Sequence, residues 1–374
     1  MHRMITKTYH SGRVAALVWL VVLSAAGCST PVPEEVPVAT GVTVFEGARL
    51  LVGDGSTPIE SATFIVEDSR FVQVGRTGEV EVPSGAVRID LTGRTVIPAI
   101  IDTHVHLSPT RSELIEDLQR KAYYGVGVVL ALGRGVSDDS FQVREETISN
   151  AARYRTAGRG ITMPEPGRTE IPYWITSEEE ARTAVQELAS LNVDIVKIWV
   201  DDRRGTKPKM KPEVYRAIIS EAHTHGMRVV AHVYYLDDAK SLVRAGVDGF
   251  AHLVRASPGV DEELARLMKE KDVFACSTMG IQWRAVGGTS WLDDPSLAET
   301  VAQDVIDKLK ERGSSGRVVR DTEAAKQMFV SLQRSIKKLH DAGVRIGLCC
   351  DTGIMGSFPG FAEHRELEMM VNAG

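Results

Sequence analysis

The stretch Val-Ile-Pro-Ala-Ile-Ile-Asp-Thr-His-Val-His, from Val96 to His106, decides the fold. Its apolar residues indicate a buried strand, and the strand ends in two histidines that are separated by one residue. Side chains at positions i and i+2 of a strand point to the same face, so His104 and His106 can reach one metal ion. The stretch therefore predicts a strand that carries part of a metal site at its end.

Four more polar residues end apolar runs further along the chain. Lys197 ends Asp-Ile-Val-Lys, His232 ends Val-Val-Ala-His, His252 ends Gly-Phe-Ala-His and Asp351 ends Gly-Leu-Cys-Cys-Asp. Taken singly, Lys197 is also consistent with a barrel lysine paired to a carboxylate, and His232 and His252 with hydrogen-bonded core histidines. The ends of parallel barrel strands meet on one face, where the active sites of such barrels lie. This shared position favours a metal hydrolase site.

From Val96 onward the pattern alternates between strands and helices. The candidate strands are Val96–Ile101, Val126–Leu132, Gly160–Met163, Val193–Val200, Arg228–Val233, Val247–His252, Val273–Ser277 and Val344–Asp351. Thr176 and Glu179 form a capping-box pattern before the expected helix Ala181–Leu191. Eight strands that alternate with helices predict an α/β protein with a (β/α)8 barrel of the TIM type over residues 96–374.

Two other regions have a different character. Residues 41–95 contain short alternating segments separated by turn sequences such as Gly-Asp-Gly (Gly53 to Gly55), which predict a small, sandwich-like β module. The connection from Met279 to Arg320 is long for a barrel. It is consistent with a substrate cover or with an insertion packed on the rim.

The first residues predict export. A basic segment precedes the apolar run Val14–Leu23, and Leu-Ser-Ala-Ala-Gly-Cys ends at Cys28. This pattern resembles a bacterial lipobox, so we expect residues 1–28 to be a lipoprotein-type signal and Cys28 to be lipidated. The alternatives are an ordinary signal peptide or a short transmembrane anchor. Residues 29–40 are rich in proline and predict an extended tether. We therefore expect an exported lipoprotein on the membrane of a bacterial cell envelope, facing the periplasm or the surface.

Composition limits the function classes. The 374 residues are 43% hydrophobic and carry a formal net charge of −6, which suits a globular core. There is no long basic block, so nucleic acid is not an expected partner. The three cysteines after Cys28 lack the spacing of a metal site, and we interpret them as packing residues: Cys276, Cys349 and Cys350.

With these residues in view, the chain resembles the amidohydrolase superfamily, in particular its imidazolonepropionase-like and prolidase-like branch. The likeness includes the order of the motifs: a β segment, His-x-His on strand one, Lys on strand four, His on strands five and six, and Asp on strand eight. The resemblance implies two divalent metal ions, with zinc as the expected metal, and an N-carboxylated Lys197 that bridges them. The implied ligands are His104, His106 and Asp351 for one ion, and His232 and His252 for the other.

The resemblance also implies the chemistry. A hydroxide shared by the two ions would attack an amide, peptide or cyclic amide bond of a small molecule, and Asp351 would carry the proton to the leaving nitrogen. The alternatives are a mononuclear deaminase, an ester or lactone hydrolase, and a surface binding lipoprotein without turnover. Family members continue with strands that complete the β module, so we expect the module here to be incomplete. Ala99 stands where the family motif has Gly, and we expect tolerance.

Three residues are candidates for substrate contact. Tyr234 and Arg255 follow the strand-five and strand-six histidines, and an arginine could clamp a carboxylate with two hydrogen bonds. This favours dipeptide-like or carboxylate-bearing amides. His364, on the last expected helix, is a substrate contact or supports the ligands. The charged run Asp201 to Arg204 could grip a substrate, although a solvated loop is the simpler interpretation.

Overall fold

The computed structural model describes residues 41–135, 137–167, 170–286, 289–314, 323–354 and 356–374. The predicted signal, Cys28 and the tether lie outside these residues. The chain divides into two compact units, Met1–Pro98 and Ala99–Gly374. Within the described ranges, no helix has both the length and the apolar character needed to cross a membrane.

The first unit is a five-stranded sheet. Its strands are β1 (Val42–Leu50), β2 (Ile59–Glu67), β3 (Arg70–Arg76), β4 (Val87–Asp90) and β5 (Thr95–Val96). β1, β2 and β3 pair antiparallel, whereas β4 and β5 run parallel to β1. Val96 pairs with Leu50, so it does not belong to the first barrel strand as predicted. Pro98 has no amide hydrogen to extend such a ladder, and the barrel strand begins only at Ile100.

The second unit contains the barrel, and every described strand pair in it is parallel. One sheet holds β6 (Ile100–Val105), β7 (Val126–Ala131) and β8 (Arg153–Thr156). The other runs in the order β10 (Tyr173–Trp174), β9 (Ile161–Thr162), β11 (Val196–Val200), β12 (Val229–Val233), β13 (Gly249–Phe250), β14 (Phe274–Cys276) and β15 (Ile346–Gly347).

Main-chain hydrogen bonds join the two sheets at both ends. The Asp194 amide donates to the Thr156 carbonyl at 3.0 Å, and the Thr103 amide donates to the Leu348 carbonyl at 3.0 Å. The ring of strands is thereby closed. The predicted α/β class and (β/α)8 barrel are confirmed.

The third barrel strand differs from the prediction, which placed it at Gly160–Met163. The structure puts β8 at Arg153–Thr156 in that position, and β9 is a short piece beside β11. β8 alternates exposed arginines with the buried Tyr154 and Thr156, so it lacks the continuous apolar run used to find the other strands. Gly158 lies between β8 and β9, and its φ of +60° is not that of an extended strand, so β8 and β9 do not form one continuous strand.

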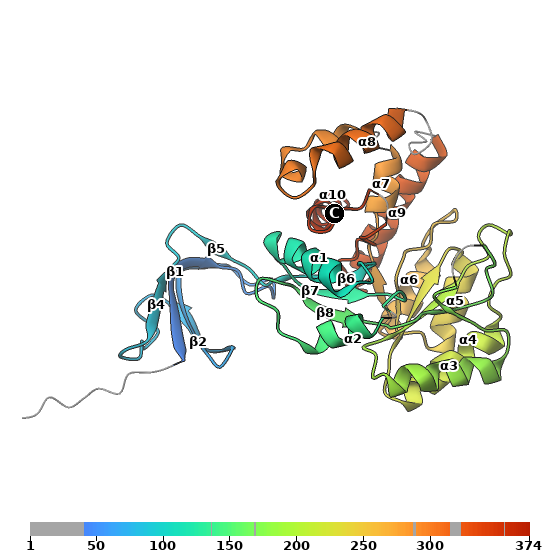
Figure 1. Cartoon of the computed structure of the whole chain (residues 1–374), viewed down its shortest axis with the longest axis horizontal. Helices are drawn as coiled ribbons and strands as arrows, with labels where there is room; N and C mark the ends of the chain where they lie inside the picture. Colours follow the sequence, from blue (N-terminus) through green and yellow to red (C-terminus); the bar gives the residue numbers. More distant parts are fainter. Residues whose placement is uncertain (1–40, 136, 168–169, 287–288, 315–322, 355) are drawn as a thin grey trace, which may run out of the picture. The chain divides into compact units, whose positions relative to one another are not determined.

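Helices cover the outside of the barrel. They are α1 (Arg111–Tyr123), α2 (Asp138–Glu145), α3 (Glu178–Ser190), α4 (Pro212–Thr224), α5 (Leu236–Ala245), α6 (Glu262–Glu270), α9 (Glu323–Asp341) and α10 (Phe361–Asn372). The capping box of α3 uses Ser177 and Glu180, one residue later than predicted, because two overlapping Ser/Thr-x-x-Glu patterns occur there. Buried apolar side chains of α3 to α6 pack against β11 to β14, and Figure 1 shows these helices beside those strands.

The long connection after β14 forms short helices. They are α7 (Gly280–Val286), η1 (Ser290–Asp293), η2 (Pro295–Glu299) and α8 (Gln303–Ser314), which lie near α10 in Figure 1. Leu292, Leu297 and Ile306 form an apolar cluster with Phe361 of α10. The described residues of this connection do not line the large cavity reported below, which supports the rim insertion over the substrate cover.

Candidate metal centre

The His-x-His pair lies where β6 ends. His104 is buried, and its Nε2 lies 3.4 Å from Oδ1 of Asp351. The Nε2 atom of His106 lies 2.9 Å from the same oxygen. Donor atoms of these three residues all lie within 4.8 Å of one another, so together they could hold one metal ion.

Asp351 reaches this position through an unusual main chain. Its φ of +50° lies in the left-handed region, which costs free energy for any residue other than glycine. Gly353 follows with φ of +88°, and a Cβ atom there would lie 1.5 Å from the His106 carbonyl oxygen. Only a glycine therefore lets the segment after strand eight pass so close to the histidine pair.

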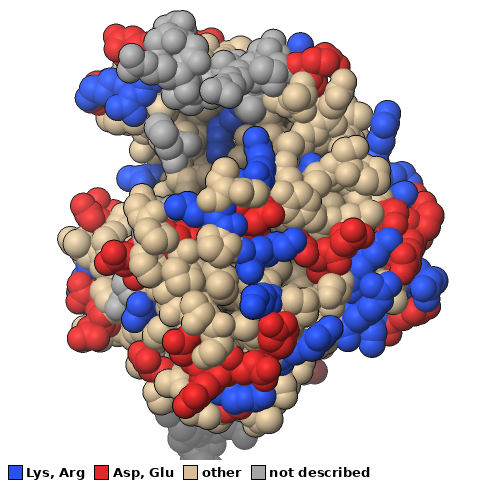
Figure 2. Space-filling model, turned by 90° about the vertical axis from the view of Figure 1, so that its right-hand side faces the viewer, with Lys and Arg blue, Asp and Glu red and all other residues tan. Residues whose placement is uncertain are grey.

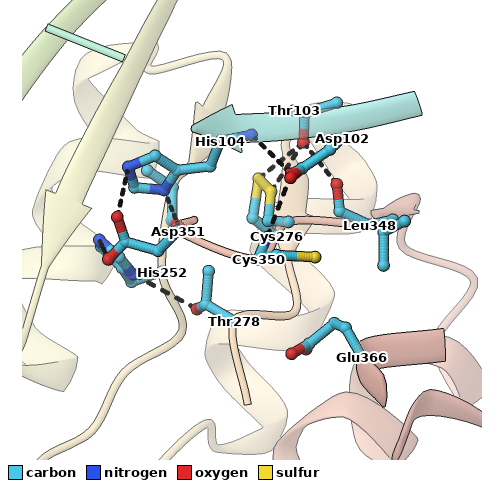
Figure 3. Close-up of a disulfide and its surroundings, with 12 residues drawn as sticks. Asp102, Thr103, His104, His252, Cys276, Thr278, Leu348, Cys350, Asp351 and Glu366 are labelled. Atoms are coloured by element: carbon cyan, nitrogen blue, oxygen red, sulfur yellow. Dashed lines mark hydrogen bonds and ion pairs between the residues drawn. A yellow bond between two sulfur atoms is a disulfide. The ribbon is translucent and has the colours of Figure 1, made fainter. Parts of the chain in front are cut away.

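The remaining two histidines extend the pair into a row. His252 Nε2 lies 3.9 Å from Asp351 Oδ2, while its Nδ1 contacts the Thr278 hydroxyl at 3.3 Å. Ring centroids are 5.0 Å apart for His106 and His104, 4.8 Å for His104 and His252, and 4.6 Å for His252 and His232. We call these four residues the imidazole row. Figure 3 shows His104 and His252 on either side of Asp351.

Burial shifts the pKa values of three histidines of the row. It lowers the pKa of His104 to about 3, and it lowers the pKa of His232 and of His252 well below the ordinary value. Burial alone would raise the pKa of Asp351, but the neighbouring His104 and His106 hold it well below its usual range. Neutral imidazoles and a carboxylate are the forms that bind metals.

Lys197 lies inside the barrel on β11. It is fully buried, and its Nζ has no hydrogen-bond partner among the residues that the structure describes. Burial lowers the pKa of this amine to about 7. Nζ lies 5.3 Å from the ring centroid of Trp199, which fits closely against Gly133 and Gly160: a Cβ atom on either glycine would lie within 2.4 Å of the indole.

A cavity of about 530 Å³ opens over the row. Its lining includes five of the six predicted ligands, all except Lys197, together with Tyr234 and Arg255. His364 does not line it. The His364 Nε2 atom instead contacts the Tyr124 carbonyl oxygen at 2.8 Å, so the structure does not place His364 at the cavity and a substrate contact by this residue stays a prediction.

Three residues of the charged run after β11 line the cavity, namely Asp201, Arg203 and Arg204, whereas Asp202 does not. Asp201 is buried, and its Oδ2 lies 3.0 Å from His232 Nε2. Arg203 forms ion pairs with Asp201 at 2.7 Å and with Glu165 at 3.1 Å. Glu165 and Trp199 also line the cavity and were not predicted. A signal exists only for Trp199, which stands two residues after Lys197 and so shares its face of the strand.

A disulfide lies beneath the site and corrects one interpretation. Cys276 and Cys349 are joined, whereas Cys350 is a buried free thiol. The Thr103 hydroxyl lies 2.7 Å from the Cys349 sulfur. Figure 3 shows Thr103 next to the disulfide. Two of the three cysteines are therefore a cross-link between neighbouring strands, and not packing thiols.

Comparisons with known proteins find several similar chains. An enamidase from Eubacterium barkeri is 22% identical over 293 residues, which cover 74% of this chain and 69% of the enamidase. An imidazolonepropionase from Micrococcus luteus is 32% identical over 131 residues, or 34% of this chain and 30% of that protein. A solved structure from Bifidobacterium longum, provisionally described as a prolidase, superposes with a TM-score of 0.72 at 25% identity, covering 90% of this chain and 79% of its own.

No protein-family model matches the chain. The relatives and the solved structure nevertheless point to one group of hydrolases, and the α/β barrel of this chain agrees with that group. Members of the group typically use divalent metals, which suits the donors found here. The chain belongs to the amidohydrolase superfamily.

Proposed function

We propose that this protein is a metal-dependent hydrolase that cleaves an amide, peptide or cyclic amide bond in a small molecule that carries a carboxylate. The observation that carries the proposal is the imidazole row beside Asp351 and the buried, unpartnered amine of Lys197. The names of the relatives, enamidase and imidazolonepropionase, point to carbon–nitrogen bonds.

The donors suit two divalent ions, with zinc as the favoured metal. Nitrogen and carboxylate ligands are those that zinc prefers, and each end of the row supplies two imidazoles. His104, His106 and Asp351 would hold one ion, and His232 and His252 the other. When bound, such ions supply an activated water at neutral pH and polarise a carbonyl group.

Lys197 would join the two ligand sets as a carbamate. With a pKa of about 7, a substantial fraction of this amine is neutral at neutral pH. The neutral nitrogen can add to the carbon of CO2 with release of one proton, which leaves an anionic carbamate with two oxygen donors. No described residue hydrogen-bonds Nζ, so no such contact has to break before the amine reacts.

Asp351 is the catalytic residue of the proposal. Its carboxylate faces His104, His106 and His252, and its low pKa keeps it ionised. An ionised carboxylate at this point can accept a proton from the attacking water and pass it to the leaving nitrogen.

Arginines of the cavity favour an anionic substrate. The charge of Arg203 is matched by Asp201 and Glu165. Arg255 has no carboxylate ion-pair partner among the described residues, and its guanidinium lies 5.4 Å from the ring centroid of Tyr234. Arg204 lies 5.8 Å from the same ring. Figure 2 shows Lys and Arg side chains around a hollow in one face of the molecule. A carboxylate held between these groups would orient a dipeptide-like substrate.

The first test is the metal content of protein purified with bicarbonate, measured by elemental mass spectrometry beside a Lys197→Ala variant. Near two ions per chain, with a clear loss in the variant, is the expected result. One ion in both proteins would favour deaminase chemistry and remove the bridging role of Lys197. Two ions without turnover of any amide, dipeptide, ester or lactone would favour a binding protein.

Location is a separate proposal that rests on the N-terminal sequence alone. Residues 1–28 would direct export, and lipidation of Cys28 would attach the protein to the membrane. Metabolic labelling with a radioactive fatty acid tests this. Label in the wild type but not in Cys28→Ser is expected, and equal label in both would contradict it.

A further inference from the structure

Behind the metal centre lies a second, fully buried group of charged residues. Its members are Lys121 of α1, Asp102 of β6 and Glu363 of α10, and each has 0% exposure. The Lys121 ammonium donates to Asp102 Oδ2 at 2.9 Å, to the Thr352 hydroxyl at 2.7 Å and to Glu363. An ammonium has three protons, so these three partners use all of them.

The network reaches the main chain beside the proposed ligands. The other oxygen of Asp102 accepts the amide hydrogens of His104 at 3.1 Å and of Cys350 at 3.2 Å, and Figure 3 shows Asp102 near both. The Thr352 carbonyl accepts the amide hydrogen of His106 at 2.7 Å. One buried cation is therefore linked to residues on both sides of Asp351 and to the His-x-His strand.

The network contacts both neighbours of Asp351, whose main-chain conformation is strained. Asp351 has the left-handed φ of +50°, and a residue persists in that region only where its surroundings hold it. Here both neighbours are anchored, Cys350 through its amide and Thr352 through its hydroxyl. A buried charged group is not needed for stability, because well-packed apolar side chains can do as well. What the charged group adds is fixed geometry.

We propose that Lys121 is a positioning residue for the ligand set His104, His106 and Asp351. Through Asp102 and Thr352 it fixes the main chain on each side of Asp351, and so sets the affinity of this end of the site for its ion. The inference rests on the proposed metal site, but the network itself is a property of the metal-free chain.

The test uses two variants and one control. Lys121→Met removes the cation and leaves two buried carboxylates. Thr352→Val keeps the ion pairs and removes the hydroxyl contacts with Lys121 at 2.7 Å and with Asp102 at 3.4 Å. Ser335→Ala is the matched control, because this buried hydroxyl accepts the Val260 amide hydrogen and has no contact with the network. If Lys121→Met does not fold, Thr352→Val decides the question.

The first readout needs no metal. Amide hydrogen exchange of the metal-free protein should speed up by about tenfold or more at Cys350 in both variants. It should not change at Ala275, whose amide donates to the Arg345 carbonyl within the barrel. Equal acceleration at both amides, or none at Cys350, would overturn the proposal, because the network would then act only on overall stability or not at all.

The second readout is competition with a chromophoric zinc chelator. One of the two ions should bind about 10- to 100-fold more weakly in Lys121→Met, while the other and the Ser335→Ala control stay unchanged. Equal weakening of both ions in Lys121→Met would contradict a positioning role at one end. If the wild type binds no metal, the proposed function fails, whereas the exchange measurement still decides whether the network positions Asp351.

Discussion

The two ends of the imidazole row have different surroundings. At one end His104 and His106 face the carboxylate of Asp351, so three donors already point at one place. At the other end the His232 Nε2 atom contacts Asp201 and the guanidinium of Arg255, each at 3.0 Å. The first end therefore already has three donors arranged so that they could hold one ion. Under the proposed function, the second end would bind its ion only after these contacts rearrange and Lys197 gains an anionic group.

The largest effect is expected from Asp351, whose carboxylate faces His104 and His106 at the first end and His252 at the second. Asp351→Asn keeps the shape of the side chain but removes the charge, so kcat/KM should fall by about 10³-fold, the range of a lost general acid–base group. The measurement is steady-state hydrolysis of the best amide from the substrate screen. Asp202→Asn is the control, because Asp202 hydrogen-bonds Tyr235 outside the cavity. Full activity of Asp351→Asn would contradict the proposed role of Asp351 in proton transfer.

Removing one histidine from each end tests whether the first end binds its ion more tightly than the second end. His106→Asn should lose the ion of the first end, and His232→Asn the ion of the second, with activity about 10²-fold lower in each. In the wild type, chelator titration followed by elemental analysis should remove the second-end ion first. The expected order of affinities is wrong if the ion that remains in His106→Asn is held more tightly than the ion that remains in His232→Asn.

Arg255, which contacts His232 at the second end, tests where the substrate carboxylate binds. Arg255→Met should raise KM for substrates with a free carboxylate by about 10- to 100-fold, since a charge-assisted pair is lost. Their amidated counterparts should show little change in KM. Arg204→Met, which alters a guanidinium more exposed to water, serves as the milder partner variant. An equal rise in KM for both substrate forms would mean that Arg255 does not bind the carboxylate.

The smallest effect, counted per pH unit, is a pH dependence of stability. Between pH 7 and 10.5 the unfolded chain keeps a proton on Lys197 that the folded chain has released. Stability of the metal-free protein should therefore rise with pH in this window, by up to about 1.4 kcal/mol per unit from this group. Urea denaturation in CO2-free buffer measures it. Lys197→Met should flatten the slope, and an unchanged slope in that variant would place the pKa of Lys197 near its ordinary value.

Sequence reasoning found what depends on local pattern. The ligand residues end apolar strands, and the parallel barrel brings such ends together. His104, His232 and Asp351 could therefore be predicted from the sequence to lie at one site, and all three line the cavity. β8 was missed because its exposed arginines hide the strand pattern.

What depends on contacts between distant segments could not be read in advance. Glu165 meets Arg203 only because two loops meet, and His364 contacts Tyr124 instead of lining the cavity. The bond between Cys276 and Cys349 requires knowing that their strands are neighbours.

The fit of Trp199 against Gly133 and Gly160 has a practical consequence. Its indole is held 5.3 Å from the Lys197 amine, at the place where the proposed chemistry would exchange a cation for an anion. Because indole emission responds to nearby charge, Trp199 can serve as an intrinsic fluorescent probe of the charge on Lys197. Bicarbonate added to the metal-free enzyme should shift the fluorescence of this tryptophan, and carboxylation could then be followed in real time without a label.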